Sequence, residues 1–573
     1  MRQLPFSAHT LGALALGLAL AGGAVACGPG SGGGAAAGGA DTTPHKGGTL
    51  YVLNNQAQED FDPARLYTSG GGNVPSLVYR TLTTRNRANG AAGTKVVPDL
   101  ATDTGEPAKD ATVWTYHLKD GLKYEDGSPI TTADIKYDIE RSFAPELSGG
   151  APYLRDWLVG AADYQGPYKD PEGLASIETP DAKTIVFHLR KPEGEFPLLA
   201  TQTSFAPVPK AKDTGTKYAE HPVSSGPYKV ISNQNNGEHI VLTRNPYWSP
   251  ATDNQRKAYP DTIDVQSGLD QSVINQRLAE GVGKDADAVT TDTNLGPSEL
   301  ARINGDRNLA SRVGTGHFGY TDYIAFNPKV KPFDDIRVRE AIAYAVDRTT
   351  VVNAQGGSSL NEAATTFLPP TASFGYTPYD PFPAGPAGNP AKAKELLKQA
   401  GYPAGLTVTL THDATKGDEQ GPEVATAVQE ALKPAGITVR LDGEEHNAFS
   451  DKIHDVRTEP GFFLAGWGAD WPSGGPFLGP IFDGRQIVAG GANFNNAQLN
   501  DPSVNNEIDA INKITDLRAA AVRWGALDKR IGERALTVPL YHPVYKRLYG
   551  KDVRGIVISD WTGVLDVSQV AVK

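Results

Sequence analysis

The chain has 573 residues, 39% of them hydrophobic and 21% charged, a composition typical of globular proteins. At roughly 150 residues per domain, this length corresponds to about three or four structural units. The formal charge of -12, from 54 basic and 66 acidic side chains, argues against a nucleic-acid partner, because such proteins present a basic face. The single Cys excludes an internal disulfide and any metal site built from several cysteines.

The amino-terminal segment has the pattern of a signal peptide. Arg2 precedes an uncharged run of 16 residues, 11–26, which is rich in Gly and short for a membrane span. The run ends in Ala24-Val25-Ala26-Cys27, so the single Cys lies at the expected cleavage point. This ending resembles a bacterial lipobox, except that Ala24 replaces the usual Leu. We expect lipidation of Cys27, with cleavage at the A-x-A sequence and a free Cys as the alternatives.

Residues 27–46 are predicted to be a flexible tether. The 19 residues after Cys27 are mostly Gly and Ala and offer almost no apolar side chain for a core. The folded body is therefore expected to begin near Gly47. It is expected outside the cytoplasm, attached by lipid to the outer face of the cell membrane.

Three segments of the body have the composition of strands. Residues 49–53 (TLYVL) form a short apolar run rich in β-formers and predict a first buried strand. Residues 113–118 and 184–189 alternate aromatic or β-branched residues with polar ones between turn signals. Each is expected to be a strand of an antiparallel sheet. No period of 20 to 50 residues repeats, which disfavours a solenoid or a propeller.

The sequence predicts one helix in the first part of the chain and another in the second. Residues 131–143 open with a Thr cap and an Asp three residues later and carry Ile135, Ile139 and Phe143 on one face. Residues 334–348 place acids at the amino end and Arg348 at the carboxyl end, with Val338, Ile342, Ala345 and Val346 on one stripe.

A helix followed by a strand recurs further along the chain. Asn389-Pro390 starts a helix that Gly401 ends, and residues 425–432 form another that leads into a strand at 437–441. This alternation is typical of βαβ units and predicts an α/β fold.

No metal site or cofactor is predicted. The charged turns Lys119-Asp120-Gly121 and Glu125-Asp126-Gly127 and the acidic residues 285–292 lack the spacing of a calcium loop. His412, His446, His454 and His542 are scattered without metal-ligand spacing. The Asp-Gly pairs are better explained as turns.

The order of several motifs resembles the extracellular solute-binding proteins of family 5, the peptide-binding and nickel-binding subunits of ABC importers. These motifs are Gly47-Gly48-Thr49-Leu50, Asp62-Pro63-Ala64, and the segments 77–82, 98–101, 114–143, 225–228, 244–248, 333–348, 391–402 and 466–472. Each motif alone is weak, but their order behind a lipobox is specific.

The resemblance implies a type II periplasmic-binding-protein fold with two lobes, a two-strand hinge and an extra small subdomain. Lobe I would comprise 47–65, 213–322 and 541–573, the inserted subdomain 66–212, and lobe II 323–540. Residues 553–559 (VRGIVIS) would form a closing strand in the tail. We expect a monomer that delivers its solute to a membrane permease with ATPase subunits.

Asp470 is the most specific candidate for a ligand-binding residue. In peptide-binding relatives, the aspartate of a Gly-Trp-x-x-Asp motif pairs with the α-ammonium of the ligand, and Gly466-Trp467-Gly468-Ala469-Asp470 matches this motif. A carboxylate closed off from water would pair strongly with such a cation. The alternative is a turn or capping role before Trp471-Pro472.

The resemblance also implies ligand contacts through aromatic faces and the main chain. Trp467 and Trp471 are expected either to wall a pocket or to belong to the core. Backbone groups of Asn55, Gln56, Ala57 and Gln58 and of Leu464, Ala465 and Gly466 are expected to hold an extended peptide. Leu464 departs from those oligopeptide-binding relatives that have Arg there for the ligand's carboxylate, which leaves the peptide length open.

The resemblance implies a binding protein rather than an enzyme, and the absence of a G-x-S-x-G, P-loop or zinc motif is compatible with this. A secreted hydrolase is the remote alternative. Within the binding class, peptides are favoured by Asp470, and oligosaccharides, nickel complexes and siderophore-like ligands stay open.

Overall fold

The structure is a computed structural model, and it describes residues 44–58, 60–67, 73–150 and 152–573. The predicted signal peptide, Cys27 and nearly all of the predicted tether lie outside these residues. In the described part of the chain, no helix combines the length and apolarity needed to cross a bilayer.

A five-stranded sheet contains the first strand of the body. Its order is β11-β1-β10-β9-β8, with β1 parallel to both of its neighbours and the other pairs antiparallel. The strands are β1 (Thr49–Leu53), β8 (Tyr228–Gln234), β9 (His239–Arg244), β10 (Thr262–Gln266) and β11 (Ala288–Val289). Leu50, Val52 and Leu53 are buried, so the predicted first buried strand is confirmed. The helices from the same stretches of chain are α1 (Pro75–Val78), α5 (Gln271–Glu280), α6 (Pro297–Asn304) and α7 (Arg307–Ala310).

A four-stranded antiparallel sheet, β4-β5-β7-β6, is built from residues 106–188. Its strands are β4 (Glu106–Ala108), β5 (Val113–His117), β6 (Ile177–Glu178) and β7 (Thr184–His188), and a separate pair consists of β2 (Thr83–Arg85) and β3 (Val96–Pro98). β5 pairs antiparallel with β7, as predicted. Trp114, Tyr116, Ile185 and Phe187 are buried and face one core, because alternate side chains of a strand share a face.

The helix predicted near residue 131 is α2 (Thr132–Arg141), and α3 (Tyr153–Trp157) and α4 (Phe196–Leu199) follow it. A carboxylate oxygen of Asp134 accepts hydrogen bonds from the backbone nitrogen of Thr131 at 2.8 Å and from its hydroxyl at 2.9 Å. Ile135, Ile139 and Phe143 are buried against the four-stranded sheet, so both the cap and the apolar face are confirmed.

A seven-stranded sheet has the order β12-β18-β13-β17-β15-β16, with β14 also paired to β18. The strands are β12 (Val313–His317), β13 (Tyr320–Phe326), β14 (Asn361–Ala363), β15 (Leu406–Asp413), β16 (Ile437–Glu444), β17 (Phe462–Gly468) and β18 (Thr537–Leu548). Its helices are α8 (Ile336–Ala345), α9 (Arg348–Ala354), α10 (Pro390–Gln399), α11 (Pro422–Leu432), α12 (His446–Ile453), α13 (Gly475–Phe482), α14 (Pro502–Asn512) and α15 (Leu517–Gly532). β15 runs parallel to β16 and β17, which bears out the predicted α/β architecture.

One predicted helix is two helices. The apolar stripe of 334–348 is buried as expected, but α8 ends at Ala345 because Val346 is extended, with ψ 116°. Asp347 then caps α9 by accepting from the backbone nitrogen of Thr350 at 3.0 Å. Arg348 therefore begins the second helix instead of ending the first. The predicted Asn389 cap of α10 is confirmed, and α11 begins three residues earlier than predicted.

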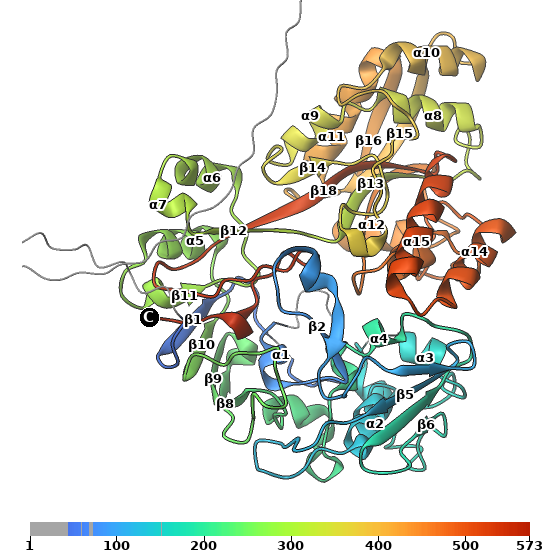
Figure 1. The fold of residues 1–573 in the computed structure, drawn as a ribbon. Coiled ribbons are helices and arrows are strands. Elements are labelled where there is room, and N and C mark those ends of the chain that lie inside the picture. The colour runs from blue at the N-terminus through green and yellow to red at the C-terminus, as the bar shows by residue number, and fades with distance from the viewer. Residues whose placement is uncertain (1–43, 59, 68–72, 151) are drawn as a thin grey trace, which may run out of the picture. The chain divides into compact units, whose positions relative to one another are not determined.

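β12 and β18 link the two largest sheets (Figure 1). The first half of β18 pairs with β13, whereas its second half, Val544 to Leu548, pairs with β12. Leu548 is buried with Leu53 of β1, so the strand ends against the five-stranded sheet. The two antiparallel strands form the crossing that the resemblance implied.

The predicted closing strand at 553–559 is wrong. The tail makes only the isolated bridges Arg554–Ala571 and Ile558–Leu565 in this region. Its apolar residues Val553, Ile558 and Leu565 instead fill the core of the five-stranded sheet beside Leu50 and Val52. A β-rich composition here reflects burial rather than pairing in a ladder.

Candidate functional site

A cavity of about 770 Å³ lies where the loop after β1 and the segment at Asn73 and Val74 meet the crossing strands. Gln56, Ala57 and Gln58, three of the four predicted residues after β1, line it. The other lining residues are Asn54, Asp60, Arg65, Leu66, Tyr67, Asn73, Val74, Thr291, Asp292, Phe318, Tyr545, Arg547, Thr562 and Val564. The size matches pockets that enclose small organic ligands.

Asp292 holds the loop after β1 in place. Its two carboxylate oxygens accept the backbone nitrogens of Asn55 at 3.1 Å and Gln56 at 2.8 Å. The hydroxyls of Thr290 and Thr293 also donate to it, at 3.4 and 3.0 Å. Sequence reasoning missed this role. Asp292 follows β11, and its approach to the loop depends on the parallel pairing of β1 with β11, which places the carboxyl ends of both strands at one edge and which the sequence did not predict.

Asp470 lies just after β17 and is half-buried. The hydroxyls of Tyr153 and Tyr67 both donate to its carboxylate, and the amide of Gln202 donates to its backbone oxygen at 3.1 Å. Burial raises the pKa of Asp470, and the two tyrosine hydrogen bonds partly offset that rise. All three donors come from residues 67–202, so the candidate carboxylate lies at a contact between distant parts of the chain.

Tyr67 connects Asp470 to the cavity. It lines the cavity and also hydrogen-bonds the carboxylate of Asp470. The structure thereby brings the two predicted ligand segments, after β1 and after β17, to a shared residue that the sequence did not single out.

Trp471 is buried in a hydrophobic core. Its side chain is 2% exposed and packs 4.7 Å from the Tyr153 ring and 5.9 Å from the Trp157 ring, measured between centroids. Its indole nitrogen donates to Glu195 at 2.7 Å. Trp467 is half-buried, donates to the Pro476 oxygen at 3.0 Å and lies 5.1 Å from the Phe494 ring.

Leu464, Ala465 and Gly466 lie within β17, and the first two side chains are buried in the core. β13 pairs with β17 along its whole length, whereas β15 pairs with it only at Phe463. From Leu464 onward, the opposite edge of β17 has no strand partner in the described part of the chain. This edge can accept an added strand.

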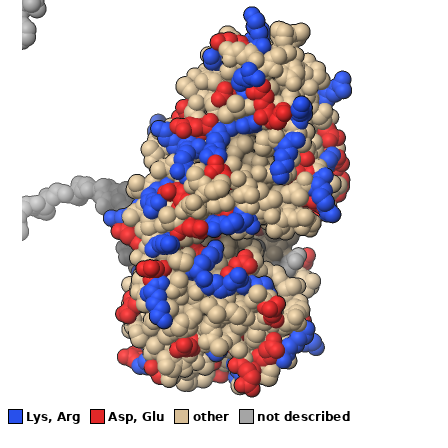
Figure 2. Space-filling view, turned by 90° about the vertical axis from the view of Figure 1, so that its right-hand side faces the viewer, with Lys and Arg blue, Asp and Glu red and all other residues tan. Residues whose placement is uncertain are grey.

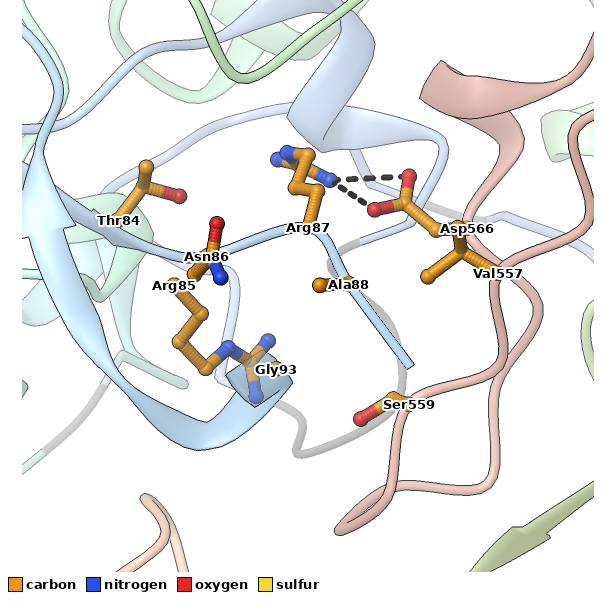
Figure 3. A pocket seen from close by; sticks show the side chains of 9 residues that line it. All are labelled: Thr84, Arg85, Asn86, Arg87, Ala88, Gly93, Val557, Ser559 and Asp566. Carbon is orange, nitrogen blue, oxygen red and sulfur yellow. Dashed lines mark hydrogen bonds and ion pairs between the residues drawn. The ribbon is translucent and has the colours of Figure 1, made fainter. Parts of the chain in front are cut away.

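Another cavity, about 70 Å³, is lined by Arg85, Arg87 and residues of the tail (Figure 3). The guanidinium of Arg87 is engaged by both oxygens of Asp566 at 3.0 and 2.9 Å. At about 30 Å³ per water, this volume holds a few water molecules and is too small for a peptide.

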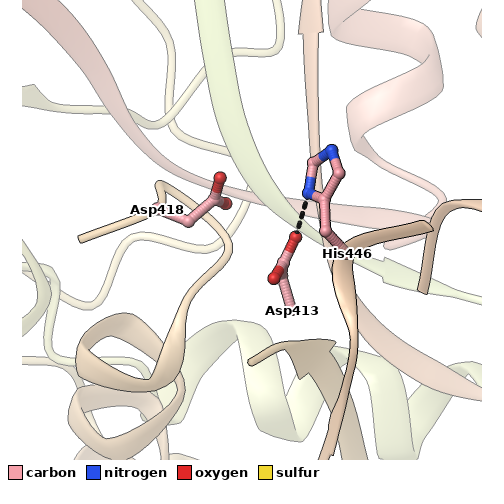
Figure 4. Close-up of side chains that lie close together, drawn as sticks. All are labelled: Asp413, Asp418 and His446. Atoms are coloured by element: carbon pink, nitrogen blue, oxygen red, sulfur yellow. Dashed lines mark hydrogen bonds and ion pairs between the residues drawn. The ribbon is translucent and has the colours of Figure 1, made fainter. Parts of the chain in front are cut away.

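Asp413, Asp418 and His446 lie close together, with ligand atoms within 4.8 Å of one another (Figure 4). The sequence did not predict this cluster. Asp413 accepts from the His446 ring at 2.6 Å and from the Thr415 backbone at 2.7 Å, and Asp418 accepts from the Gln420 backbone at 2.8 Å. An ion pair and two turn hydrogen bonds account for the three groups, so we assign no metal site.

Basic and acidic side chains are intermixed on the face drawn in Figure 2. That face therefore lacks the continuous basic surface that nucleic-acid binding requires.

Comparison with known proteins gives the family. Residues 95–488, more than half of the chain, match the bacterial extracellular solute-binding proteins, family 5 Middle. The chain is 28% identical to the periplasmic oligopeptide-binding protein OppA of Escherichia coli over 466 residues, which are 79% of this chain and 80% of that protein. It is 25% identical to the glutathione-binding protein GsiB of Salmonella paratyphi A over 460 residues, 79% of this chain and 82% of that one.

Solved structures agree with this assignment. The clavulanic acid biosynthesis oligopeptide binding protein 2 is 33% identical, with a TM-score of 0.85 over 92% of this chain and 96% of that one. DppA of Helicobacter pylori, solved with the peptide STSA, shares the fold at 22% identity, with a TM-score of 0.67 over 92% and 98% of the two chains. This chain therefore belongs to family 5 of the bacterial extracellular solute-binding proteins.

Proposed function

We propose that this protein is the extracytoplasmic binding subunit of an ABC importer and that its solute is a short peptide with a free amino end. The relatives in Escherichia coli and Salmonella are named for oligopeptides and glutathione, and the solved protein at 33% identity is named for oligopeptides. Family membership and these names support a binding protein and not an enzyme.

Asp470 carries the peptide assignment. Its donors are two tyrosine hydroxyls, and in the described part of the chain no Lys, Arg or His nitrogen lies within 4 Å of its carboxylate. A half-buried carboxylate without a cation has lost part of its hydration, and an ammonium group of the ligand would compensate for that loss. We assign that role to the α-ammonium of the peptide.

The main chain would hold the rest of the peptide. The open edge of β17 beside Leu464, Ala465 and Gly466 offers strand-like hydrogen bonds, and Gln56, Ala57 and Gln58 face the cavity. Backbone contacts of this kind are insensitive to the ligand's sequence, which suits an importer of mixed peptides.

Calorimetry with tetra-alanine and N-acetyl-tetra-alanine tests the ammonium pairing. We expect Asp470→Asn to weaken binding of the free-amine peptide by more than about tenfold, because a charged hydrogen bond is lost, and to leave the acetylated peptide nearly unaffected. An equal loss of affinity for both peptides would contradict the pairing of Asp470 with the ammonium group.

Asp528 provides a matched control. It is also an aspartate, its carboxylate is buried and accepts from the backbone nitrogen of Leu368 at 3.3 Å, and it does not line the cavity. Asp528→Asn should leave both affinities unchanged. Binding of a sugar, nickel complex or siderophore-like ligand without any peptide would show that the role given to Asp470 is wrong.

We also propose lobes formed by 47–65, 213–322 and 541–573 and by 323–540, with 66–212 as an inserted subdomain. Each part contributes most of one sheet and one core, which supports the division, although residues within 74–79 and Ala206 pack in the core of the five-stranded sheet and β12 and β18 run between parts. Ligand would favour the closed arrangement through its higher affinity for that state. The closed monomer would then dock on the permease and its ATPase subunits.

Lipidation of Cys27 completes the proposal, since an anchored binding protein stays close to its permease. Mass spectrometry of the native amino terminus tests it. A diacylglycerol-modified Cys27 is expected, and an unmodified terminus at another residue would contradict it.

A further inference from the structure

Arg547 is a buried guanidinium on β18 that faces the 770 Å³ cavity. Its side chain is 2% exposed, and its Nε donates to the Gly563 oxygen at 2.7 Å. Nη1 is buried, and neither Nη1 nor Nη2 makes a hydrogen bond to any of the described residues. A buried donor without a partner is costly and calls for an explanation.

The other charged groups of the cavity already have partners of their own within hydrogen-bond distance. Arg65 contacts Asp60, with 2.9 Å between Nε and a carboxylate oxygen. Asp292 is surrounded by the two backbone nitrogens and two hydroxyls described above. No carboxylate of the described residues lies within 4 Å of Arg547. Burial lowers the pKa of Arg547 to about 10, so it remains protonated at neutral pH, and Asp292, which lines the same cavity, raises that pKa from beyond that distance.

The surroundings hold the guanidinium in one place. Its carbon lies 5.4 Å from the centroid of the Tyr545 ring, and Tyr545 in turn stacks on Phe318 at 4.9 Å. Both rings line the cavity. A fixed planar fork with free nitrogens is the geometry that recognises a carboxylate through two parallel hydrogen bonds.

We propose that Arg547 binds a carboxylate of the peptide inside this cavity. The inference rests on the proposed function. It supplies the anion recognition that Leu464 does not offer, and it makes the site selective for peptides that carry both an ammonium group and a carboxylate. The carboxylate has two possible sources, the carboxyl terminus and an acidic side chain.

Four probes separate the two sources in calorimetry: Ala-Ala-Ala-Ala as free acid and as amide, and the amides of Ala-Ala-Glu-Ala and Ala-Ala-Gln-Ala. We expect the wild-type protein to bind a carboxylate-bearing peptide at least about tenfold more tightly than its neutral counterpart in one of the two pairs. The pair that shows the preference identifies the source.

Arg547→Gln should abolish that preference by weakening only the carboxylate-bearing peptide, and Arg547→Lys should keep part of it because the charge remains. Arg348 is the control. It is also a buried arginine whose Nε donates to a backbone oxygen, that of Pro539 at 3.0 Å, and it does not line this cavity. Arg348→Gln should retain the full preference.

Two results would overturn the inference alone: wild-type protein that binds all four probes equally, or Arg547→Gln protein that keeps the preference. The first needs no variant, so a folding defect cannot obscure it. If the wild-type protein binds none of the probes but a non-peptide solute, the proposed function fails as well.

Discussion

Glu459 is a buried carboxylate outside the proposed peptide site. It is 6% exposed, accepts from the Asn493 amide at 3.2 Å through one oxygen, and leaves the other oxygen without a hydrogen bond. Burial raises its pKa to about 8, against smaller opposing effects of Gln498, Lys329 and Asn493. The group is thus protonated in the folded protein at pH values where the unfolded chain is ionised.

This raised pKa predicts a loss of stability on going from pH 5 to pH 8. The folded state holds a proton that the unfolded state has released, so each pH unit in this window lowers the free energy of unfolding by up to about 1.4 kcal/mol. Glu459→Gln removes that contribution. Urea denaturation at pH 6 and pH 8 should show a difference that is smaller in the variant by roughly 2 kcal/mol.

Glu430→Gln is the control for this measurement. Glu430 is exposed on α11 and pairs with Lys433 at 2.6 Å, and exposed pairs contribute little. If Glu459→Gln and Glu430→Gln have the same dependence on pH, the proton on Glu459 is not the cause.

At the scale of the element, β17 depends on the absence of a side chain at Gly466. A Cβ there would lie 2.2 Å from the Tyr320 hydroxyl and 2.7 Å from the Gln420 amide nitrogen. Because both distances are far below van der Waals contact, β17 or these side chains must shift. The proposed peptide edge begins in this strand.

We expect Gly466→Ala to weaken tetra-alanine and N-acetyl-tetra-alanine alike, by about tenfold, since the main-chain edge moves while Asp470 keeps its charge. Calorimetry with both peptides measures this. Gly479→Ala in α13 is the control, because its Cβ would meet nothing within 4 Å. A loss confined to the free-amine peptide would contradict the main-chain role of β17.

At the scale of the whole molecule, Glu195 joins two parts of the chain that are far apart in sequence. Its carboxylate accepts from the Trp471 indole at 2.7 Å, the Trp524 indole at 2.9 Å and the Ser473 hydroxyl. Burial raises its pKa, and these hydrogen bonds lower it. The backbone nitrogen of Gly194 adds a bond to the Asn512 oxygen at 2.6 Å.

Glu195→Gln should lower the free energy of unfolding by about 1–3 kcal/mol, because an amide cannot accept from all three buried donors. Chemical denaturation followed by tryptophan fluorescence suits the test, since two of the donors are indoles. Glu395→Gln, on an exposed side chain of α10, should change stability by less than about 0.5 kcal/mol. Equal stability of wild-type and Glu195→Gln protein would show that this contact does not stabilise the fold.

Local signals in the sequence were sufficient for most elements. The caps of α2 and α10 and the strands β1, β5 and β7 depend on neighbouring residues and on burial of one face, so they were predicted close to their observed bounds. The break between α8 and α9 at Val346 and the core packing of the tail at 553–559 were not predicted. Whether a β-rich run joins a ladder or fills a core depends on residues elsewhere in the chain.

The family and the motif around Asp470 were already determined by the sequence, because motif order and cap chemistry are local properties. Only the tertiary structure decided what surrounds that carboxylate. Tyr67 and Tyr153 approach it from more than 300 positions away, Asp292 fixes the loop after β1, and Arg547 lines the cavity. Such contacts are set by how distant segments pack, which no local pattern encodes.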